Sequence, residues 1–165
     1  MNDREGRQLA GTPGSMERLE ALGIVLPVLA SPVNAYVDAV LDEGLLYLSG
    51  KGPRRPDGTR RSGKVGGDVS VEEAREDARI TGVNLLTAIA SAVGSLQKVE
   101  RVVKVLGLVN AVPEFTEHPR VIDAFSELML DVFGDKGRHA RSAIGVGSLP
   151  NGMTVEIEMI VRVRP

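Results

Sequence analysis

The spacing of apolar residues predicts two long helices and one short one. Ser70-Val-Glu-Glu73 has the form of a capping box, in which serine and glutamate side chains satisfy the first backbone amides, and it opens a helix that Gly94 ends. Pro119 suits the first turn of a second helix, whose apolar residues recur every three or four positions up to Gly134. A short helix over residues 15–22 precedes both.

Alternating apolar and polar residues predict the strands. Residues 36–41 and 45–49 are expected to pair across a tight turn at Asp42-Glu-Gly44. The continuous β-branched run over residues 101–109 is typical of a central strand covered on both faces. The last 25 residues predict a β-hairpin whose turn is Leu149-Pro-Asn-Gly152, because proline presets a turn and Asn-Gly tolerates positive φ.

In this hairpin the alternation places Arg141 and Glu156 on one face and an apolar set on the other. With the turn centred between Asn151 and Gly152, Glu156 lies opposite Gly147 and roughly 20 Å from Arg141, at about 3.3 Å per residue. A simple cross-strand ion pair is the alternative interpretation, but this separation argues against it. We therefore hypothesise that the two side chains serve a site that a neighbouring subunit completes.

The predicted order ββαβαββ defines an α+β fold with two helices on one face of a mostly antiparallel sheet. No predicted helix remains for the second face, which is expected to carry Arg141, Glu156 and Glu158. A face that mixes charges with small residues favours contact with other copies of the chain. Residues 1–14 are expected to be a mobile natural extension or a cloning remnant, and residues 15–165 a single domain.

Composition narrows the function classes. The 165 residues carry a net charge of −2, no cysteine and two histidines, His118 and His139. Disulfides and thiol catalysis are excluded, and neither a structural zinc site nor any other metal is expected. With five aromatic residues and no basic excess, nucleic acid is not the expected partner. No apolar run is long enough to span a membrane, so we expect a cytoplasmic protein.

A basic loop between the second strand and the first long helix offers one further motif. Gly58-Thr-Arg-Arg-Ser-Gly-Lys64 matches the phosphate-binding pattern G-x-x-x-x-G-K but continues with Val65, where serine or threonine would hold magnesium. No strand precedes the motif and no helix starts on its lysine. A solvated loop is the preferred interpretation, with phosphate contact left as the alternative for its basic residues, Arg54, Arg55, Arg60, Arg61 and Lys64.

The end of the chain contains a specific motif, His139-Ala-Arg-Ser-Ala-Ile-Gly-Val-Gly-Ser-Leu-Pro150 followed by Val155-Glu-Ile-Glu158. This motif resembles the signature of the YjgF/RidA family, and Phe133-Gly-Asp-Lys-Gly-Arg-His-Ala-Arg-Ser142 looks like a divergent branch of it. From Tyr36 onward the order of elements also matches. The resemblance implies a chorismate-mutase-like (ferredoxin-like) fold and a homotrimer with a central barrel and three intersubunit clefts. It further implies cofactor-free hydrolysis of the reactive imines that pyridoxal-phosphate enzymes produce.

Five residues match functional positions of that family. The resemblance implies that Arg141 holds the substrate carboxylate and that Glu156 positions or activates the attacking water. Tyr36 and Ser49, thirteen residues apart as in the family, are expected to line the cleft, and Gly50 to bring its backbone close to ligand.

The chain departs from the family pattern at two residue positions and in the loop before Arg141, which looks longer than in the family. Ala143 stands where the family often has cysteine, and Ile122 or Asp123 stands where it has asparagine.

Three functions are compatible with these residues. The first is an imine deaminase acting on 2-iminobutanoate- or 2-iminopropanoate-type substrates, with Arg141 and Glu156 as the catalytic residues. The second is a trimeric protein that binds a small carboxylate without turnover, which the departures at the cleft allow. The third, with less support, is an endoribonuclease or translation inhibitor, because RNA cleavage by acid–base chemistry would call for a histidine or several cations in the cleft.

Overall fold

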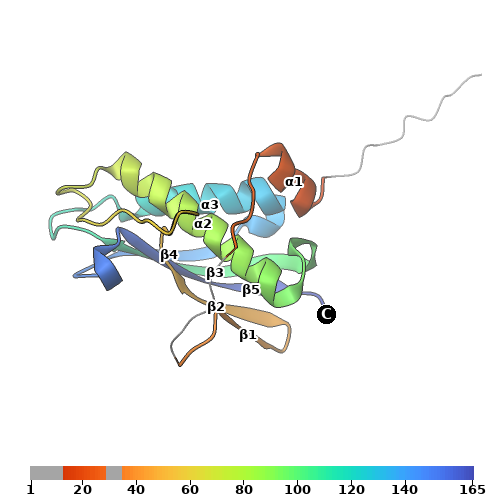
Figure 1. Cartoon of the computed structure of the whole chain (residues 1–165). Coiled ribbons are helices and arrows are strands. Elements are labelled where there is room, and N and C mark those ends of the chain that lie inside the picture. Colours follow the sequence, from red (N-terminus) through yellow and green to blue (C-terminus); the bar gives the residue numbers. More distant parts are fainter. Residues whose placement is uncertain (1–12, 29–34) are drawn as a thin grey trace, which may run out of the picture.

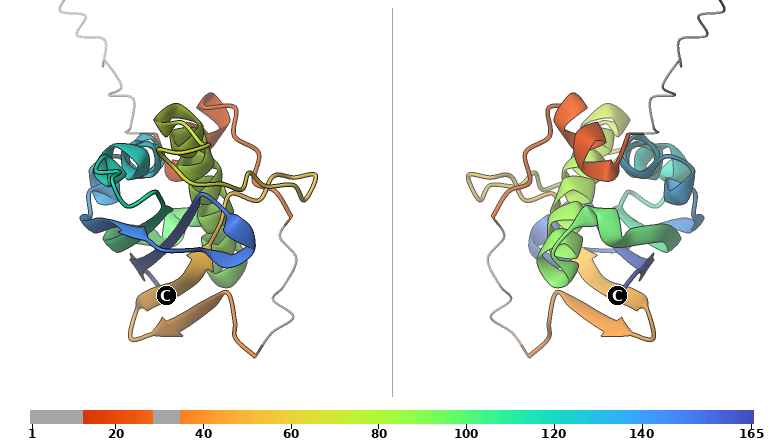
Figure 2. Two further views of the ribbon diagram at one scale, coloured as in Figure 1. Left: turned by 90° about the vertical axis from the view of Figure 1, so that its left-hand side faces the viewer. Right: turned by 90° about the vertical axis from the view of Figure 1, so that its right-hand side faces the viewer.

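The computed structural model describes residues 13–28 and 35–165 of the chain. A five-stranded sheet in the order β1-β2-β5-β3-β4 carries the helices on one of its faces (Figure 1). The two views of Figure 2 show the same layering from either side, with β1 and β2 curving away from the helices. The elements follow one another as α1 (Ser15–Ala21), β1 (Ala39–Asp42), β2 (Leu45–Lys51), α2 (Val71–Val93), β3 (Val99–Asn110), α3 (His118–Phe133), β4 (Ala140–Val146) and β5 (Val155–Val163).

Short 3₁₀ turns, η1 (Leu96–Lys98), η2 (Gly134–Gly137) and η3 (Pro150–Gly152), join some of these elements. The ββαβαββ order and the α+β class are those predicted from the sequence. The prediction for residues 1–14 falls largely on residues outside the described part of the chain, in which only Pro13 and Gly14 are included.

The helix ends agree with the local signals in the sequence. The Ser70 hydroxyl accepts a hydrogen bond from the backbone N–H of Glu73, whose carboxylate accepts from the Ser70 N–H in return. Gly94 ends α2 with a φ of 86°, a left-handed conformation that costs glycine little. Gly134 ends α3 with a φ of 60°.

The predicted C-terminal hairpin is wrong. β4 and β5 lie on opposite sides of β3, with β4 parallel to β3 and β5 antiparallel to it. Asn151 and Gly152 do adopt positive φ, as the sequence suggested, but their turn carries the chain past the end of β3. The reason is topological: α3 connects β3 to β4 as a helical crossover, which makes these two strands parallel neighbours and leaves the other edge of β3 for β5.

The pairing also corrects the predicted position of Arg141. Arg141 is the partner of Val105 in the parallel ladder, and Val105 is fully buried beneath the helices. Glu156 pairs with Leu108, on the opposite face, where Leu108 is only partly buried. Arg141 therefore points to the helix side of the sheet and Glu156 to the other side, whereas the sequence placed both on one face.

The core lies between the helices and the sheet. It is filled by fully buried residues of α2, α3 and the strands, among them Leu85, Ile89, Phe125, Leu128 and Val161. The predicted burial of β3 on both faces is not seen within this chain, since its 104, 106 and 108 side chains are only half-buried. Across the described residues, no helix covers this second face (Figure 1).

The uncovered face mixes apolar and charged side chains. Val40 pairs with Tyr47, and both are exposed on it, with relative accessibilities of 54% and 42%. Glu156 and Glu158 lie on the same face of β5. Among the described residues, no helix is both long and apolar enough to cross a membrane.

The N-terminal segments are shifted slightly from their predicted places. β1 begins at Ala39, so that Tyr36 lies before the strand. Ile24 and Leu26 pack against the hydrophobic core in a stretch without regular structure.

Candidate functional site

The first part of the candidate site is centred on Glu156 and an irregularity in β2. The β2–β5 register shifts between Leu48 and Lys51, which leaves Ser49 and Gly50 in a β-bulge. Gly50 lies directly against Glu156: a Cβ atom on residue 50 would be 3.0 Å from Cδ of Glu156 and closer still to Oε1. The absence of a side chain at Gly50 is therefore what allows the Glu156 carboxylate to occupy this place.

Burial, and then the nearby negative charge of Glu158, raise the pKa of the Glu156 carboxyl. Both effects favour the neutral acid, since neither low dielectric nor a like charge stabilises the carboxylate. Within residues 13–28 and 35–165, no side chain is hydrogen-bonded to this carboxyl. A carboxyl with a raised pKa and no such partner takes up a proton more readily than an ordinary exposed carboxylate, which makes Glu156 a candidate general base.

Ser49 and Tyr36 extend this region toward β1. The Ser49 hydroxyl donates to the carbonyl of Val37 at 2.6 Å, so it fixes the segment that leads into β1 while its lone pairs stay free to accept. Tyr36 precedes that carbonyl by one residue and is 52% exposed. The structure thus brings Ser49, Gly50 and Glu156 together and leaves Tyr36 at their border.

The second part of the candidate site is centred on Arg141, between β4 and α3. Its Nη1 donates to Oδ1 of Asp123 at 2.8 Å and to the Ser126 hydroxyl at 3.0 Å. Asp123 and Ser126 are one turn apart on α3 and therefore face the same way. A cavity of about 270 Å³ adjoins these groups and is also lined by Arg138 and His139.

His139 completes a hydrogen-bonded chain with Ser126. Nδ1 of the imidazole lies 2.7 Å from the carbonyl oxygen of Gly137, which can only accept, so Nδ1 carries the proton. Nε2 then accepts from the Ser126 hydroxyl at 3.0 Å. Burial lowers the pKa of His139, helped by the charge of Arg141, although the bond to Gly137 acts in the opposite direction. The imidazole is thus neutral at pH 7, and Arg141 remains the principal cation of this chain of contacts.

The two parts of the site are separated within one chain. Arg141 and Glu156 lie two strands apart and are offset by three residues along β3, which corresponds to about 14 Å between backbones. They also project from opposite faces of the sheet. A small ligand bound to one of them cannot reach the other in the same chain.

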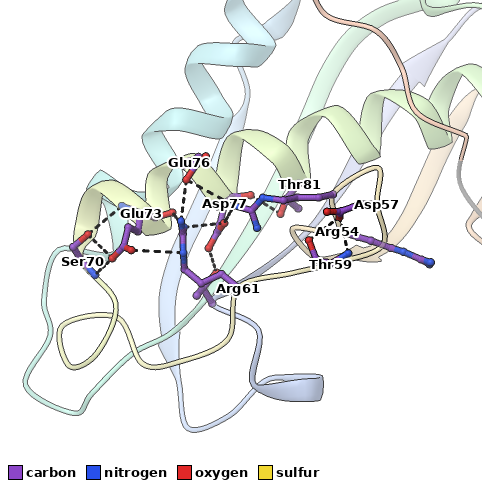
Figure 3. Close-up of polar contacts among 12 residues, drawn as sticks. Arg54, Asp57, Thr59, Arg61, Ser70, Glu73, Glu76, Asp77 and Thr81 are labelled. Atoms are coloured by element: carbon purple, nitrogen blue, oxygen red, sulfur yellow. Dashed lines mark hydrogen bonds and ion pairs between the residues drawn. The ribbon is translucent and has the colours of Figure 1, made fainter.

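The loop that contains the near-match to a phosphate-binding motif is neither a phosphate loop nor freely solvated. Arg61 binds the side of α2 through Asp77 at 3.1 Å and Glu76 at 3.0 Å (Figure 3). Lys64 donates to the carbonyl oxygen of Gly147 at 2.5 Å, and Val65 is fully buried. These contacts occupy Arg61 and Lys64, whereas Arg54 and Arg60 of the same loop are exposed.

Asp77 is the centre of this network. Its side chain is fully buried on α2, where Oδ2 accepts from the Thr154 hydroxyl at 2.7 Å and Oδ1 faces Arg61 and Arg55. Burial raises the pKa of Asp77, while the bonds from Thr154 and Arg61 oppose this rise. The contact to Thr154 ties α2 and the basic loop to the residue that precedes β5, and hence to the strand that carries Glu156.

Within the described ranges, no three histidine, aspartate or glutamate side chains are grouped so that they could hold a metal ion.

The ββαβαββ order, with helices on a single face of the sheet, is a chorismate-mutase-like fold. A family model described as "YjgF/chorismate mutase-like, putative endoribonuclease" matches residues 16–157, and the protein belongs to this family.

Its relatives span most of the chain. Protein TCP17 of Trypanosoma cruzi is 40% identical over 144 residues, which cover 87% of this chain and 90% of that protein. The crystal structure of Atu1372 from Agrobacterium tumefaciens has 41% identity and a TM-score of 0.81, over 88% of this chain and 89% of that one. A structure from Shewanella oneidensis superposes with a TM-score of 0.87 at 26% identity, over 92% of this chain and 100% of that one.

Sequence reasoning named Asp123 only as a departure from the family pattern. It missed Ser126 as a partner of Arg141, and His139 as the partner of Ser126. The spacing of Asp123 and Ser126 on a helix, with Arg141 on the strand that follows, was the available signal. Asp77 was missed as well, although a carboxylate beside the apolar stripe of α2 is itself an indication of a buried ion pair.

Proposed function

We propose that this protein hydrolyses small 2-imino acids, without a cofactor, in clefts between the subunits of a homotrimer. Arg141 binds the substrate carboxylate through its guanidinium fork, and Glu156 accepts a proton from the attacking water. The oxygen of that water bonds to the imine carbon while the electrons of the C=N bond move to nitrogen, which takes up a proton. The hydroxyl proton then passes to the amine nitrogen, the oxygen electrons form the C=O bond as the C–N bond breaks, and ammonia and a 2-oxo acid are released.

The observation that carries the proposal is the placement of Arg141 and Glu156 on opposite faces of the sheet. A substrate with only a few heavy atoms can touch both groups only if one subunit supplies the arginine and another the glutamate. Arg141 lies near the outer edge of the sheet, on β4, and Glu156 lies on the face that no described helix covers. Both positions are open to a second copy of the chain, and closed symmetric assemblies are the usual way to cover such a face.

The raised pKa of Glu156 supports the chemical role. A general base is most effective when its pKa lies close to the working pH, and burial moves this carboxyl in that direction. Beyond this, the reaction needs mainly orientation of a water molecule against a polarised imine. Ser49 and the backbone beside Gly50 complete the pocket on the Glu156 side.

Two other functions compete with this proposal. Binding of a small carboxylate without turnover is the second candidate, because it needs Arg141 alone and not the activation of water proposed for Glu156, although the Arg141–Asp123 ion pair reduces the positive charge offered to such a ligand. RNA cleavage has less support, because Arg55 and Arg61 of the basic loop are already paired with acidic side chains of α2.

The test is the release of ammonia from 2-iminopropanoate generated in situ. Arg141→Ala and Glu156→Gln should each abolish the enzymatic rate, whereas Arg79→Ala, a change of an exposed arginine on α2, should leave it unchanged. A wild-type protein without turnover that still binds 2-oxo or amino acids through Arg141 would establish the binding protein instead.

Subunit mixing tests where the site lies. If Arg141→Ala and Glu156→Gln chains are co-expressed and assemble at random, roughly a quarter of the clefts contain both native side chains. Activity should therefore return to roughly a quarter of the wild-type value in the mixture. Mixed assemblies that stay inactive, or a wild-type protein that is monomeric in solution, would contradict a site shared between subunits.

A further inference from the structure

A larger cavity lies at the end of the molecule that holds α1 and the C-terminus, on the right in Figure 1. Its volume is about 780 Å³, within the range of roughly 300–1,000 Å³ that is usual for small-ligand sites. Residues of α1, of η1, of the end of α3 with η2, and Arg164 directly after β5 form its walls. It shares Leu130 and Arg138 with the 270 Å³ cavity but does not include Arg141. The larger cavity is therefore a second place where a ligand can bind.

The walls of this 780 Å³ cavity carry a strong excess of positive charge. Four cations line it, Arg18, Lys136, Arg138 and Arg164, against the single carboxylate of Asp135. Asp135 is 96% exposed and 3.4 Å from Arg138, so this ion pair is weak and leaves the other three cations unaffected. Among the described residues, no ion pair joins Arg18, Lys136 or Arg164 to an acidic group. Such a cavity favours an anion that carries more than one charge.

Two of the arginines are held by backbone carbonyls and keep further donors unused. Nε of Arg18 donates to the carbonyl of Pro13 at 3.1 Å, and Nη2 of Arg164 donates to the carbonyl of Gln97 at 2.7 Å. Within residues 13–28 and 35–165, the two Nη atoms of Arg18 and the Nε and Nη1 atoms of Arg164 have no hydrogen-bond partner. The Arg18 guanidinium also lies over Gly134, where a Cβ would be 3.4 Å from Nη2. Both side chains are thus fixed before a ligand arrives, which lowers the entropic cost of binding.

A hydroxyl without a partner gives a second, independent indication of a ligand. Ser15 lines the cavity, and its Oγ is withdrawn from solvent without a hydrogen bond to any residue that the structure describes. Buried polar atoms in this condition are uncommon and costly in folded proteins. Rotation about a single side-chain bond turns the hydroxyl toward an acceptor in the cavity and removes this cost.

We infer that the 780 Å³ cavity binds a small phosphate ester, at a site separate from Arg141 and Glu156. A phosphate monoester carries about two negative charges near neutral pH and three acceptor oxygens, which can meet the fixed arginines and a serine hydroxyl at once. A single carboxylate offers fewer acceptors and one charge. The cavity is larger than a phosphate ion requires, and Leu130 and Phe133 add apolar groups to its wall for the organic part of the ester.

Phenyl phosphate and benzenesulfonate provide a matched pair of probes. They have the same ring and a similar tetrahedral head, but at pH 8 the phosphate carries about one negative charge more. In isothermal titration calorimetry at low salt, the full chain should bind phenyl phosphate about tenfold more tightly than benzenesulfonate. Inorganic phosphate, which lacks the ring, should bind more weakly than phenyl phosphate.

Substitutions in the wall locate the site. Arg18→Gln and Arg164→Gln should each lower the affinity for phenyl phosphate about tenfold. Lys136→Gln changes an exposed side chain without a described partner, so it should keep the fold intact and lower the affinity about threefold. Arg79→Gln, a change of an exposed arginine on α2, should bind as wild type does. Arg141→Ala should also bind as wild type does, since Arg141 is outside this cavity.

Ser15→Ala separates a binding role from a structural one. The hydroxyl has no described partner to lose, so thermal melting of the ligand-free variant should match or exceed that of wild type. Its affinity for phenyl phosphate should nevertheless fall about threefold. Together with Lys136→Gln, this variant carries the test if an arginine substitution unfolds the protein.

Several results would overturn the inference. Equal affinity for phenyl phosphate and benzenesulfonate would do so, as would folded wall variants that all bind like wild type. Loss of binding in Arg141→Ala would move the phosphate to the other cavity. Inorganic phosphate bound as tightly as the ester, or a single-stranded RNA oligomer that binds more tightly and displaces it, would exclude a small ester as the ligand. A protein that hydrolyses no imine but binds phenyl phosphate in the expected manner would retain the inference.

Discussion

Replacing Gly50 by alanine is expected to displace the Glu156 carboxylate and to slow the proposed imine hydrolysis without unfolding the protein. The backbone of Gly50 does not have a positive φ, so alanine can adopt it without strain. The added Cβ would lie 3.0 Å from Cδ and 3.1 Å from Cγ of Glu156, whereas ordinary contacts begin at 3.4 Å. The end of a flexible side chain can move away at little cost, so the fold should persist.

The size of the effect follows from these distances. Restoring normal contacts requires the carboxylate to move by about 1 Å, and a displacement of that size from a reacting geometry can cost on the order of 10² in rate. We therefore expect kcat/KM for 2-iminopropanoate to fall on the order of 10²-fold. The free energy of unfolding should change by less than about 1 kcal/mol. Steady-state kinetics and thermal melting measure the two quantities separately.

Two glycines provide matched controls. A Cβ on Gly147 would meet nothing within 4 Å, so Gly147→Ala should retain activity. A Cβ on Gly52, just beyond the end of β2, would press on the side chain of Met153, which makes Gly52→Ala a control for crowding away from Glu156. Full activity in Gly50→Ala, at normal stability, would refute the assignment of Glu156 as the base. A loss of activity that accompanies unfolding would refute the steric reasoning.

Three further predictions follow from the contacts of buried groups. Glu158→Gln removes a negative charge that raises the pKa of Glu156, so the acidic limb of the pH profile of kcat/KM should move to lower pH. Asp77→Ala leaves the buried Thr154 hydroxyl without its acceptor and removes one of the acidic partners of Arg61 and Arg55, and it should lower the free energy of unfolding by about 3 kcal/mol in urea titrations. Gly107→Ala would place a Cβ 2.6 Å from Cγ1 of Ile122 in the core and should cost about 1–3 kcal/mol.

A specific result would contradict each of these three predictions. A pH limb that stays in place or moves upward in Glu158→Gln would show that the two carboxyls do not interact. Asp131→Ala, which removes an exposed ion pair with Arg79, should cost less than about 0.5 kcal/mol, and an equal cost for Asp77→Ala would refute the role of its burial. A Gly107→Ala protein as stable as wild type would mean that Ile122 repacks freely.

The sign of the pH effect on stability can also be stated. The folded-state pKa values of Asp77 and Glu156 lie above their unfolded values, so folding is favoured by these groups at low pH and the contribution is lost as the pH rises through the folded values. The native Glu156 carboxyl should make the free energy of unfolding fall as the pH rises above about 4–5, by an amount proportional to the difference between its folded and unfolded pKa values. Glu156→Gln should remove this part of the fall.

The helices were predictable because their signals are local. Ser70, Glu73 and Gly94 act on backbone groups within one or two turns, and the apolar period of α3 requires no knowledge of the remainder of the chain. Strand pairing was not predictable in the same way. The turn at Asn151-Gly152 suits a hairpin, but the partner of β5 was decided by the helical crossover between β3 and β4, which no local pattern of residues 139–163 reveals.

The candidate site was also predictable only in its local features. Residue types and family resemblance picked out Arg141 and Glu156, but their faces depend on strand pairing, and the prediction that they share one was wrong. The close approach of Gly50 to Glu156 depends on a bulge, and the pairing of Asp123 with Arg141 depends on the distance between α3 and β4. Non-local geometry of this kind is set by packing, and a single sequence carries little information about it.

The position of β5 in the sheet has a consequence for how the protein is made. β5 lies between β2 and β3 in the sheet. The β1–β2 pair and the β3–α3–β4 unit therefore cannot join into one sheet until residues 155–163 have left the ribosome. Until then β2 and β3 each expose an unpaired edge to other nascent chains, and contacts distant in sequence must form last. We therefore expect chains that stop shortly before Glu156 to aggregate, and synthesis of the final strand to be the step that commits the protein to its native sheet.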